Sequence, residues 1–400
     1  VFMTDPILDA LRPQPTGGLI VTFKQDADLP TQLAAMENSV GAGVRSFSAQ
    51  TEGVADFDDA TPALVLEDVG IAFVSDQGAA PDAEARLTDN DSTEAVRPEF
   101  WMFDTAPPFD DTADRTWGVA ATGAETSNQN GAGIKLCVLD TGLDLNHADF
   151  ATRSVTSRSF VPNEAVQDGQ GHGTHCAGTA CGRNVTPNIP RYGVAPEAEL
   201  FVGKVLNNAG SGRERDILAG MLWAIQEGCD VISMSLGRAV RPGETHSLEY
   251  ERLGRMALDR DSLIVAAAGN DSRRNIGFIA PVGAPANSPS IMAVAALDQN
   301  LAIAEFSCGG INGDGGEVDI AGPGVAVFSS VPRPRNYQAL RGTSMACPHV
   351  AGLAALWAQT DAGLRGQALW DKLIHTANDV QLPPRDVGAG LAQAPSGLTH

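Results

Sequence analysis

The chain has 400 residues, of which 49 are acidic and 27 basic, so its formal net charge is −22. An apolar fraction of 43% supplies ample material for a hydrophobic core and excludes disorder throughout. Because Lys and Arg are not clustered, a nucleic-acid binder is not expected. The longest apolar runs, such as Val350–Ala358, are far shorter than the ~20 residues of a membrane-spanning helix.

The first 115 residues are distinguished by their charge. They carry 22 acidic and 6 basic side chains, a net charge of −16, which leaves −6 for the rest of the chain. Since one domain usually holds roughly 100 to 200 residues, a small α+β unit followed by a larger domain is predicted. The small unit is expected to contain a strand at Leu19–Lys24, a helix at Leu29–Val40, one or two strands within Ala63–Val74, and linker-like acidic stretches at Ala79–Pro98 and Asp104–Asp114.

From Ile134 onward, short apolar runs alternate with helix-length segments. Continuous apolar strands separated by helices indicate a parallel sheet covered on both faces. In such sheets, ligands bind beyond the carboxyl ends of the strands. The expected strands are Lys135–Leu139, Leu200–Val205, Val231–Met234, Leu263–Ala268 and Ile291–Ala296, and the expected helices include Arg215–Glu227 and His246–Asp259.

Three polar residues stand in Gly-rich or strand-terminal settings. Asp140 ends the first of these strands, His172 lies in a Gly-rich approach to a helix, and Ser344 begins an apolar helix that runs to about Ala358. Taken singly, each has an ordinary explanation, as a turn residue, a hydrogen-bonded loop histidine and a helix cap. Together they supply the hydroxyl, the imidazole and the orienting carboxylate that nucleophilic hydrolysis needs.

A fourth polar residue, Asn270, closes the apolar strand Ala266–Ala268 after Gly269. A side-chain amide in this position can donate to the oxyanion of a tetrahedral intermediate. The plain alternative is a strand-ending Asn at a turn. The other three residues favour the catalytic interpretation.

Four segments resemble, in the same order, the signature blocks of subtilisin-like serine peptidases. They are Val138–Gly142, Gly171–Thr179, Ala266–Asn270 and Gly342–Ala346. The chain order Asp, His, Ser is also that of subtilisin. The resemblance extends from about Trp117 to Ala394 and implies a three-layer αβα fold with a mainly parallel central sheet. Features most similar to the proteinase K type are Cys176, Gly203-Lys204-Val205-Leu206 and Asp319–Gly324.

The resemblance implies catalytic roles by position. Ser344 would be the nucleophile, His172 the general base and then acid, and Asp140 the orienting carboxylate. Asn270 and the backbone N–H of Ser344 would form the oxyanion hole. Catalysis of this kind uses no cofactor.

Substrate-binding segments are implied in the same way. Gly210, Ser211 and Gly212 would pair with an extended substrate as an added strand, which gives main-chain affinity with little sequence demand. Ser235, Leu236, Gly237, Ala268 and Gly269 would line the first specificity pocket. Walls of this composition suit an apolar P1 side chain and offer nothing to a basic one.

Two departures from the family pattern concern metal and thiol chemistry. Asp149 stands where relatives often ligate calcium, although Ala148 replaces the usual Pro. Carbonyl oxygens of the loop Arg183–Tyr192 could add ligands, although this loop differs in length from the family's, so a structural calcium site is expected here. Cys347 stands where the family usually has Thr; a buried packing thiol is favoured over a mercurial-sensitive one.

The acidic N-terminal unit loosely resembles the inhibitor-type prosegment of secreted subtilases. The predicted organisation is an extension at 1–16, a prosegment-like domain at 17–98, an acidic linker at 99–116 and a peptidase domain at 117–400. The apolar cluster Phe100-Trp101-Met102-Phe103 suits substrate subsites. Three interpretations stay open: a cleavable intramolecular inhibitor, a permanent regulatory domain and a partner-docking module.

The favoured function is a serine endopeptidase that acts on proteins or peptides and is made as a self-inhibited precursor. The alternatives are a catalytically silent scaffold and a narrow-specificity processing peptidase with a permanent regulatory domain. An esterase of the α/β-hydrolase type would need Gly-x-Ser-x-Gly and the order Ser, Asp, His, and neither is found. No membrane partner is expected.

Two further expectations concern compartment and cysteines. No basic stretch followed by an apolar run marks a secretory signal, so a cytoplasmic location is expected, with secretion after removal of a preceding signal as the alternative. Six cysteines in 400 residues are not typical of a disulfide framework.

Overall fold

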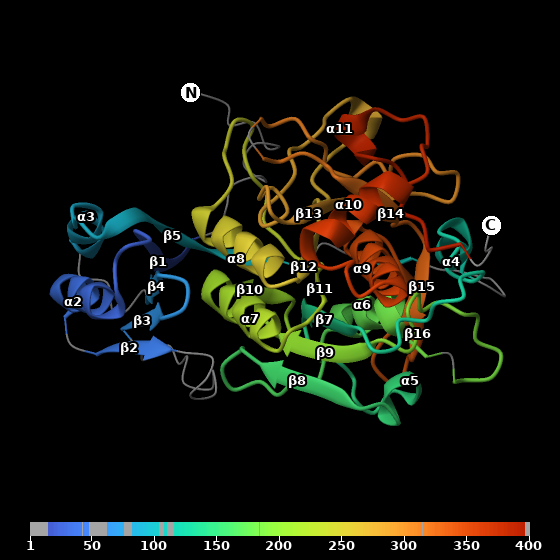
Figure 1. The fold of residues 1–400 in the computed structure, drawn as a ribbon, viewed down its shortest axis with the longest axis horizontal. Coiled ribbons are helices and arrows are strands. Elements are labelled where there is room, and N and C mark those ends of the chain that lie inside the picture. Colours follow the sequence, from blue (N-terminus) through green and yellow to red (C-terminus); the bar gives the residue numbers. More distant parts are fainter. Residues whose placement is uncertain are drawn as a thin grey trace.

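The computed structural model describes residues 15–41, 43–47, 62–75, 82–103, 108–109, 116–183, 185–313 and 315–396. A small N-terminal unit lies beside a larger α/β domain (Figure 1). The larger domain is built on a sheet of seven parallel strands in the order β14-β13-β12-β11-β7-β9-β8. These strands are β7 (Lys135–Asp140), β8 (Val155–Ser159), β9 (Glu199–Lys204), β11 (Val231–Met234), β12 (Leu263–Ala267), β13 (Met292–Leu297) and β14 (Ile320–Pro323).

Helices cover both faces of this sheet. Along β7, Leu136 and Val138 join a core formed with α6 and α9, whereas Cys137 and Leu139 join a second core formed with α7 and α8. Alternate side chains of a strand point to opposite faces, so the sheet is buried on both sides and the predicted three-layer αβα fold is confirmed. The helices of the domain are α4 (Trp117–Ala121), α5 (Ala148–Ala151), α6 (His172–Cys181), α7 (Glu214–Gln226), α8 (Leu248–Asp259), α9 (Thr343–Thr360), α10 (Gly366–Thr376) and α11 (Pro384–Val387).

The N-terminal unit is an α+β sandwich with its own core. The predicted helix is observed as α2 over Leu29–Val40, and Asp28 caps it by accepting from the Thr31 N–H (3.0 Å). Helices α2 and α3 pack on one face of the sheet. The unit contains β1 (Pro15–Phe23), β2 (Val44–Phe47), β3 (Ala63–Leu66), β4 (Ile71–Val74), α3 (Ala83–Thr88) and β5 (Thr93–Phe103).

The linker predicted over Ala79–Pro98 is wrong for the part that the structure describes. This stretch contains α3 and the first half of β5, which pairs antiparallel with β1 and crosses the predicted domain boundary at 98/99. The sequence pattern did not predict this strand because it lacks an apolar run. Of its residues, Val96 packs into the small core, whereas the charged Arg97 and Glu99 face the larger domain. Strand β1 likewise begins at Pro15, inside the predicted extension. The stretch Asp104–Asp114 lies outside the described residues except for β6 (Pro108–Phe109).

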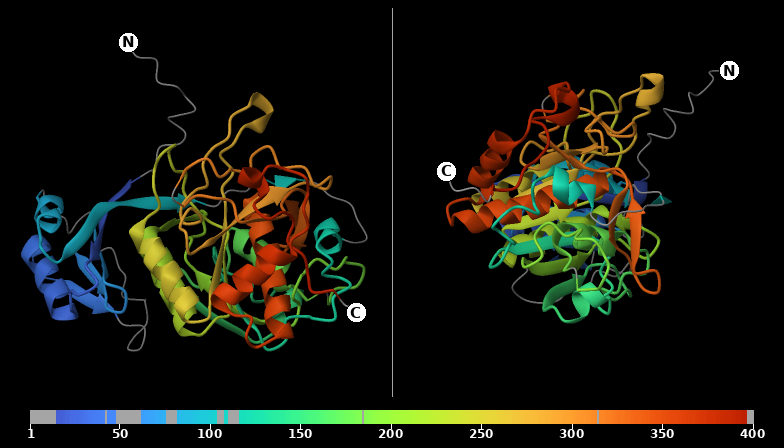
Figure 2. Two further views of the ribbon diagram at one scale, coloured as in Figure 1. Left: turned by 45° about the horizontal axis from the view of Figure 1, so that its top comes forward. Right: turned by 90° about the vertical axis from the view of Figure 1, so that its right-hand side faces the viewer.

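Two short pairings connect the N-terminal part with the larger domain. Strand β5 continues beyond β1 onto β10 (Ser211–Arg213), so that one sheet has the order β10-β5-β1-β4-β3-β2. Figure 2 shows β5 reaching from the small unit to the larger domain. Strand β6 pairs with β16 (Tyr337–Leu340), which also pairs with β15 (Val327–Ser330). The chain therefore contacts the larger domain both before and after residues 104–107.

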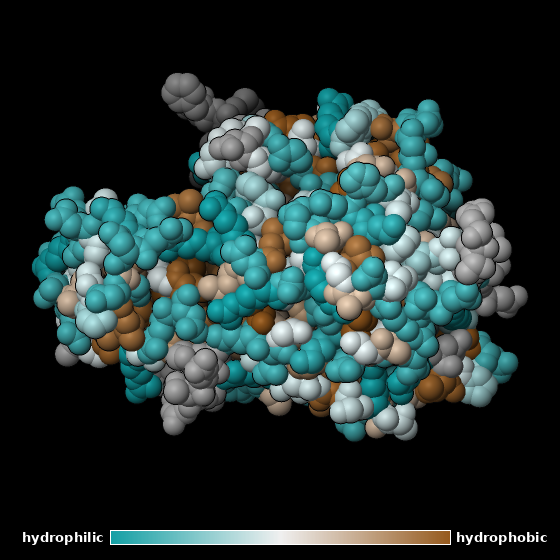
Figure 3. Space-filling model, viewed as in Figure 1, coloured by the Kyte–Doolittle hydropathy of each residue, from teal (hydrophilic) through white to brown (hydrophobic). Residues whose placement is uncertain are grey.

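The surface of the molecule carries both polar and apolar side chains. Figure 3 shows a mostly hydrophilic face with scattered apolar side chains. Among the helices of the described residues, none is both long and apolar enough to cross a bilayer.

Candidate active site

At one end of the parallel sheet, Asp140 and His172 pair directly, and Ser344 begins the helix that packs beside them. Asp140 is the last residue of β7, His172 the first of α6 and Ser344 the second of α9. Helices α6 and α9 pack against each other and against β7. Gly173 permits this approach, because a Cβ there would lie 2.3 Å from the Gly142 carbonyl oxygen. The sequence blocks are therefore brought together by helix packing at the carboxyl end of β7.

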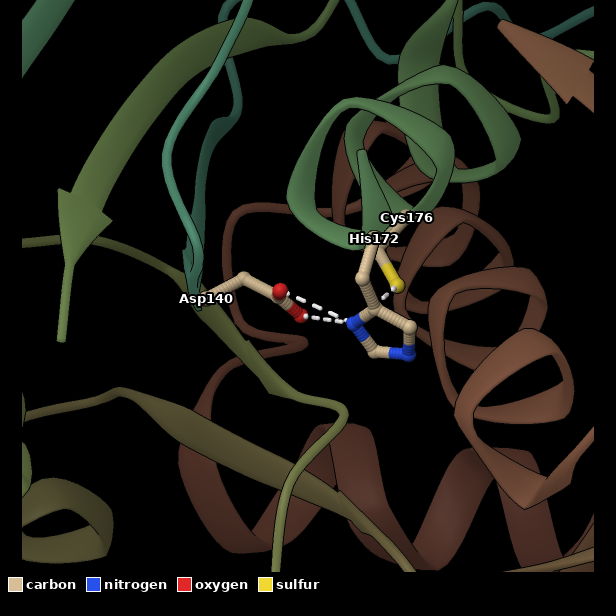
Figure 4. A group of neighbouring side chains, drawn as sticks. All are labelled: Asp140, His172 and Cys176. Atoms are coloured by element: carbon tan, nitrogen blue, oxygen red, sulfur yellow. Dashed lines mark hydrogen bonds and ion pairs between the residues drawn. The ribbon is translucent and has the colours of Figure 1, made fainter. Parts of the chain in front are cut away.

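Asp140 and His172 form a buried pair (Figure 4). The two carboxylate oxygens lie 2.8 and 3.0 Å from His172 Nδ1, and Oδ1 also accepts from the Thr141 N–H (2.7 Å). Burial alone would lower the pKa of His172, but the charge of Asp140 and its hydrogen bond hold that pKa well above the usual value of 6.5. The pair stabilises the imidazolium form, as a group that accepts a proton during reaction requires.

Ser344 lies at the amino end of the long helix α9, where backbone N–H groups point outward and favour negative charge. Gly342 leads into the helix with φ of +149°, a conformation that other residues rarely adopt. The Ser344 hydroxyl donates to the Ser235 carbonyl (3.3 Å). His172 Nε2 is buried and has no hydrogen-bond partner among the described residues, so it can receive a proton.

Asn270 is oriented by its neighbour across the site. Its Oδ1 accepts from both the N–H (2.8 Å) and the hydroxyl (3.0 Å) of Thr343. The amide nitrogen is thereby directed to the turn before Ser344, 3.3 Å from where a Cβ on Gly342 would lie. The site thus contains a side-chain donor beside the helix amino end, an arrangement that can stabilise an oxyanion.

Asp168 is a supporting residue that the sequence reasoning missed. Its carboxylate accepts from the Thr141 hydroxyl (2.9 Å), the Gly171 N–H (2.8 Å) and the Thr174 N–H (2.9 Å). It therefore ties the end of β7 to the first turn of α6. The available signal was a carboxylate four residues before a helical histidine, which is consistent with helix capping.

The cysteines near the site are packing groups. Cys176 Sγ lies 3.8 Å from His172 Nδ1 (Figure 4). Asp140, His172 and Cys176 bring possible metal ligands within 4.8 Å of one another, but burial raises the pKa of Cys176, and the neutral thiol is a poor ligand. Cys347 is buried and contacts the Val265 carbonyl oxygen (3.3 Å). All six cysteines are free and buried.

The predicted substrate-binding residues lie in three segments, and two of these segments contact the turn that contains Ser344. Ser211 and Gly212 pair with Phe103 and Met102 of β5, and Gly210 precedes them with φ of +82°. The Ser235 hydroxyl donates to the Ser344 carbonyl (2.8 Å), and the Gly269 N–H donates to the Thr343 hydroxyl (3.1 Å). The remaining members of the set, Leu236, Gly237 and Ala268, belong to the same two segments, in which Leu236 and Ala268 are buried.

A charged seam, not foreseen from the sequence, joins the N-terminal unit to α7 and α8. We define it as Arg97, Glu99, Glu214, Asp216 and Glu249. Arg97 binds both oxygens of Glu214 (2.6 and 3.2 Å) and Oε2 of Glu249 (3.0 Å). The Phe100 N–H donates to Glu214 (2.9 Å). These partners are more than 100 residues apart in sequence, so no local pattern reveals them.

Asp149, the predicted calcium ligand, lies in a separate cluster. It is 1% exposed and accepts hydrogen bonds from the hydroxyls of Tyr192 and Tyr337. It is not part of any described group of three or more ligating side chains. Among the described residues, the donors to its carboxylate are two phenol hydroxyls and the Val185 N–H.

Comparison with known proteins identifies a family and several relatives that this chain resembles. The model of the Subtilase family matches residues 131–390. Subtilisin DY of Bacillus licheniformis is 38% identical over 263 residues, which are 66% of this chain and 90% of that protein. Subtilisin E of Bacillus subtilis (strain 168) is 40% identical over 240 residues, 60% of this chain and 58% of that protein. Alkaline elastase YaB of Bacillus sp. (strain YaB) is 38% identical over 282 residues, 70% of this chain and 68% of that protein.

The family match covers more than half of the chain and includes Asp140, His172, Asn270 and Ser344. The parallel sheet between two helical layers is the fold expected for such a protein. The chain therefore belongs to the subtilase family and is a serine endopeptidase.

Proposed function

We propose that the chain cleaves peptide bonds through an acyl-enzyme in which Ser344 is the nucleophile. His172 takes the hydroxyl proton and later gives it to the leaving amine, while Asp140 holds the ring and stabilises its positive charge. The observation that carries this proposal is the buried pair between Asp140 and His172 Nδ1 at 2.8 Å, with His172 Nε2 left without a described partner. No cofactor takes part in these steps.

The oxyanion of the tetrahedral intermediate forms between Asn270 and the amino end of α9. The Asn270 amide nitrogen and the Ser344 N–H are its donors in this proposal. Thr343 supports the role because it occupies Asn270 Oδ1 and so keeps the nitrogen facing the site. Preorganised donors of this kind act without reorganisation cost when charge develops.

Active-site labelling tests the catalytic assignment against the scaffold alternative. A fluorophosphonate probe should label the processed wild-type enzyme and not Ser344→Ala. Absence of labelling in wild type after removal of the N-terminal unit would favour a silent scaffold. Labelling that persists in Ser344→Ala would identify a different nucleophile.

We further propose that the N-terminal unit inhibits the peptidase in cis and is then cleaved. Support comes from β5 lying antiparallel on β10 and from β6 lying on β16, which ends at Leu340, shortly before Ser344. An extended chain on β10 has the backbone arrangement of a bound substrate. The cleavage then falls between Phe103 and Pro108.

N-terminal sequencing of purified protein tests this proposal. Wild type should acquire a new N-terminus within 104–108, whereas Ser344→Ala should keep the full chain. A fully active, uncleaved wild type would instead support a permanent regulatory domain. A cleavage that persists in Ser344→Ala would show that another peptidase performs it.

The resemblance of this sequence to the proteinase K type within the subtilase family stays a prediction.

The proposed specificity is for apolar P1 residues. Leu236, Ala268 and the glycines beside them provide no charged partner for a P1 side chain, and a Cβ on Gly237 would lie only 2.7 Å from the Ala284 carbonyl oxygen. A peptide library cleaved by the processed enzyme, with and without a chelator, should show apolar P1 residues in both conditions. Enrichment of basic P1 residues would contradict the proposal. A narrow profile outside P1 would indicate a processing role.

A further inference from the structure

We infer that Asp149, which the family resemblance assigns to calcium, is held instead by two tyrosine hydroxyls, and that this hydroxyl clamp takes the place of a metal ion. The clamp consists of Asp149, Tyr192 and Tyr337, with Val185 as a backbone donor. Oδ2 of Asp149 accepts from the hydroxyls of Tyr192 and Tyr337 (2.9 Å for the latter), and Oδ1 accepts from the Val185 N–H (3.2 Å).

The proton positions follow from chemistry. An ionised carboxylate only accepts, and a phenol has one proton to give. The Tyr337 hydroxyl also lies 2.8 Å from the Thr186 hydroxyl, so Thr186 can supply the proton for that contact while the Tyr337 proton points to Asp149. Hydrogen bonds to a charged acceptor are roughly twice as strong as neutral ones. Three donors therefore stabilise the buried charge.

His147 borders the clamp. Its Nδ1 accepts from the Asp149 N–H (3.2 Å) and lies 3.9 Å from Asp149 Oδ2, and its Nε2 lies 2.8 Å from the Asn336 carbonyl oxygen. The hydrogen bonds to the carboxylate oxygens therefore come from the two phenols and the Val185 amide.

The tyrosine rings cannot easily swing aside for an ion. Tyr192 is buried and packs edge-on against Phe328 and Tyr337, at ring centroid distances of 6.1 and 5.9 Å. Tyr337 stacks on Phe328 (5.6 Å) and meets His147 edge-on (5.1 Å). Calcium needs six to eight oxygens at about 2.3–2.6 Å, and it would have to displace both phenols from Oδ2.

The clamp joins three segments that are distant in sequence. Asp149 lies in α5, Val185 and Tyr192 in the loop after α6, and Tyr337 at the start of β16. In the family resemblance, calcium at this aspartate would tie the same loop to the domain. The hydrogen bonds of the clamp perform that function here without a metal.

Thermal unfolding of the full chain carrying Ser344→Ala, which prevents self-digestion, tests the clamp without reference to activity. Tyr192→Phe and Tyr337→Phe should each lower the Tm by roughly 3–10 °C, since each removes a hydrogen bond to a charged group. Tyr250→Phe is the matched control, because the Tyr250 hydroxyl is buried and has no hydrogen-bond partner among the described residues; its Tm should not fall.

Calcium and chelator form the second arm. Excess EDTA or added CaCl2 should either leave the Tm of the parent and of Asp149→Asn unchanged or shift both Tm values by the same amount. A calcium-dependent rise in the Tm of the parent that Asp149→Asn abolishes would overturn the inference. A Tyr192→Phe variant as stable as Tyr250→Phe would overturn it as well.

Discussion

At the scale of single residues, the catalytic groups depend on partners that fix their orientation. Thr343 directs the amide of Asn270, and Asp168 holds the turn that presents His172. Thr141 contributes its N–H to Asp140 and its hydroxyl to Asp168. These buried bonds limit the conformations of the reacting side chains, which is what electrostatic preorganisation requires.

Replacing Asn270 should lower turnover with little change in substrate binding. Asn270→Ala removes a donor that acts mainly when the oxyanion forms, so kcat should fall by about 10²–10³, a magnitude known from subtilisin, with KM nearly unchanged. Asn270→Asp is the companion variant, because it keeps the oxygen that accepts from Thr343 but replaces the amide donor with a carboxylate oxygen, which cannot donate and also repels an oxyanion. Steady-state kinetics of both would contradict the role if Asn270→Asp retained wild-type kcat.

The pH dependence of kcat/KM should report the Asp140–His172 pair. Burial opposes the charge on His172, but Asp140 outweighs it and raises the pKa above 6.5. The base must be neutral to accept a proton, so activity should be lost as the pH falls through this raised pKa. Asp140→Asn should move the acid limb of the profile to lower pH and reduce kcat by about 10⁴. An unchanged acid limb in this variant would exclude Asp140 as the cause.

Considering elements, the contact between β5 and the larger domain includes one partly buried, ion-paired side chain, that of Arg97. Arg97 is 19% exposed at its side chain, while those of Glu214 and Glu249 are 0% and 2% exposed. Glu249 also accepts from the hydroxyls of Thr22 and Ser247. Strand β5 therefore brings one guanidinium to two carboxylates that start α7 and α8, where negative charge is also favoured by the helix dipoles.

Removing this guanidinium should loosen the N-terminal unit. Arg97→Gln leaves two buried carboxylates without their cation, a change that costs about 3–5 kcal/mol when buried pairs are broken. In the Ser344→Ala chain, limited proteolysis should cut the N-terminal unit faster in this variant. Arg86→Gln is the control, because the Arg86–Asp82 pair lies within α3 with both side chains more than half exposed and contributes about 0–1 kcal/mol. Equal cutting of the two variants would contradict the role of Arg97.

At the scale of the whole molecule, the seam concentrates acidic groups between two units of unequal charge. Asp216 faces Arg215, Glu99 and Arg213, and Glu99 faces Thr16, Arg215 and Glu214. Burial raises the pKa of Asp216 to about 7 and also raises that of Glu99. The acidic N-terminal unit, with a net charge of −16 in the first 115 residues, therefore packs against a part of the larger domain that is itself rich in carboxylates.

Docking of the N-terminal unit should weaken as the pH rises. Both carboxyls have raised pKa values in the docked state, so their contribution to docking is greatest when they are protonated. This contribution should decline from the ordinary carboxyl pKa of about 3.8 up to about 7, and the lowered pKa of Glu249 acts in the opposite sense only at the acid end of this range. Hydrogen exchange of β5 in the Ser344→Ala chain, corrected for the intrinsic rate, should therefore increase over this window. Asp216→Asn stays neutral and should show less pH dependence; equal protection at every pH in the parent would contradict the prediction.

Features that depend on local pattern could be predicted from the amino-acid sequence. Continuous apolar strands predicted the parallel sheet, and Leu29–Val40 was predicted with its observed limits. Gly-rich turns at strand and helix ends marked Asp140, His172 and Ser344, because close backbone approach requires glycine there. These signals are contained in a few neighbouring residues, so they can be recognised without knowledge of the fold.

Contacts between distant segments could be recognised only once the chain was seen folded. Strand β5 was not predicted, because the charge of its Arg97 is neutralised by Glu214 and Glu249, which lie more than 100 residues away. Asp149 was predicted as a calcium ligand because its neighbours in the sequence resemble those of relatives. Tyr192 and Tyr337, which are distant from it in the sequence, hydrogen-bond to it in the folded chain. The environment of a buried charge is set by whatever packs around it, and that packing is a property of the folded chain.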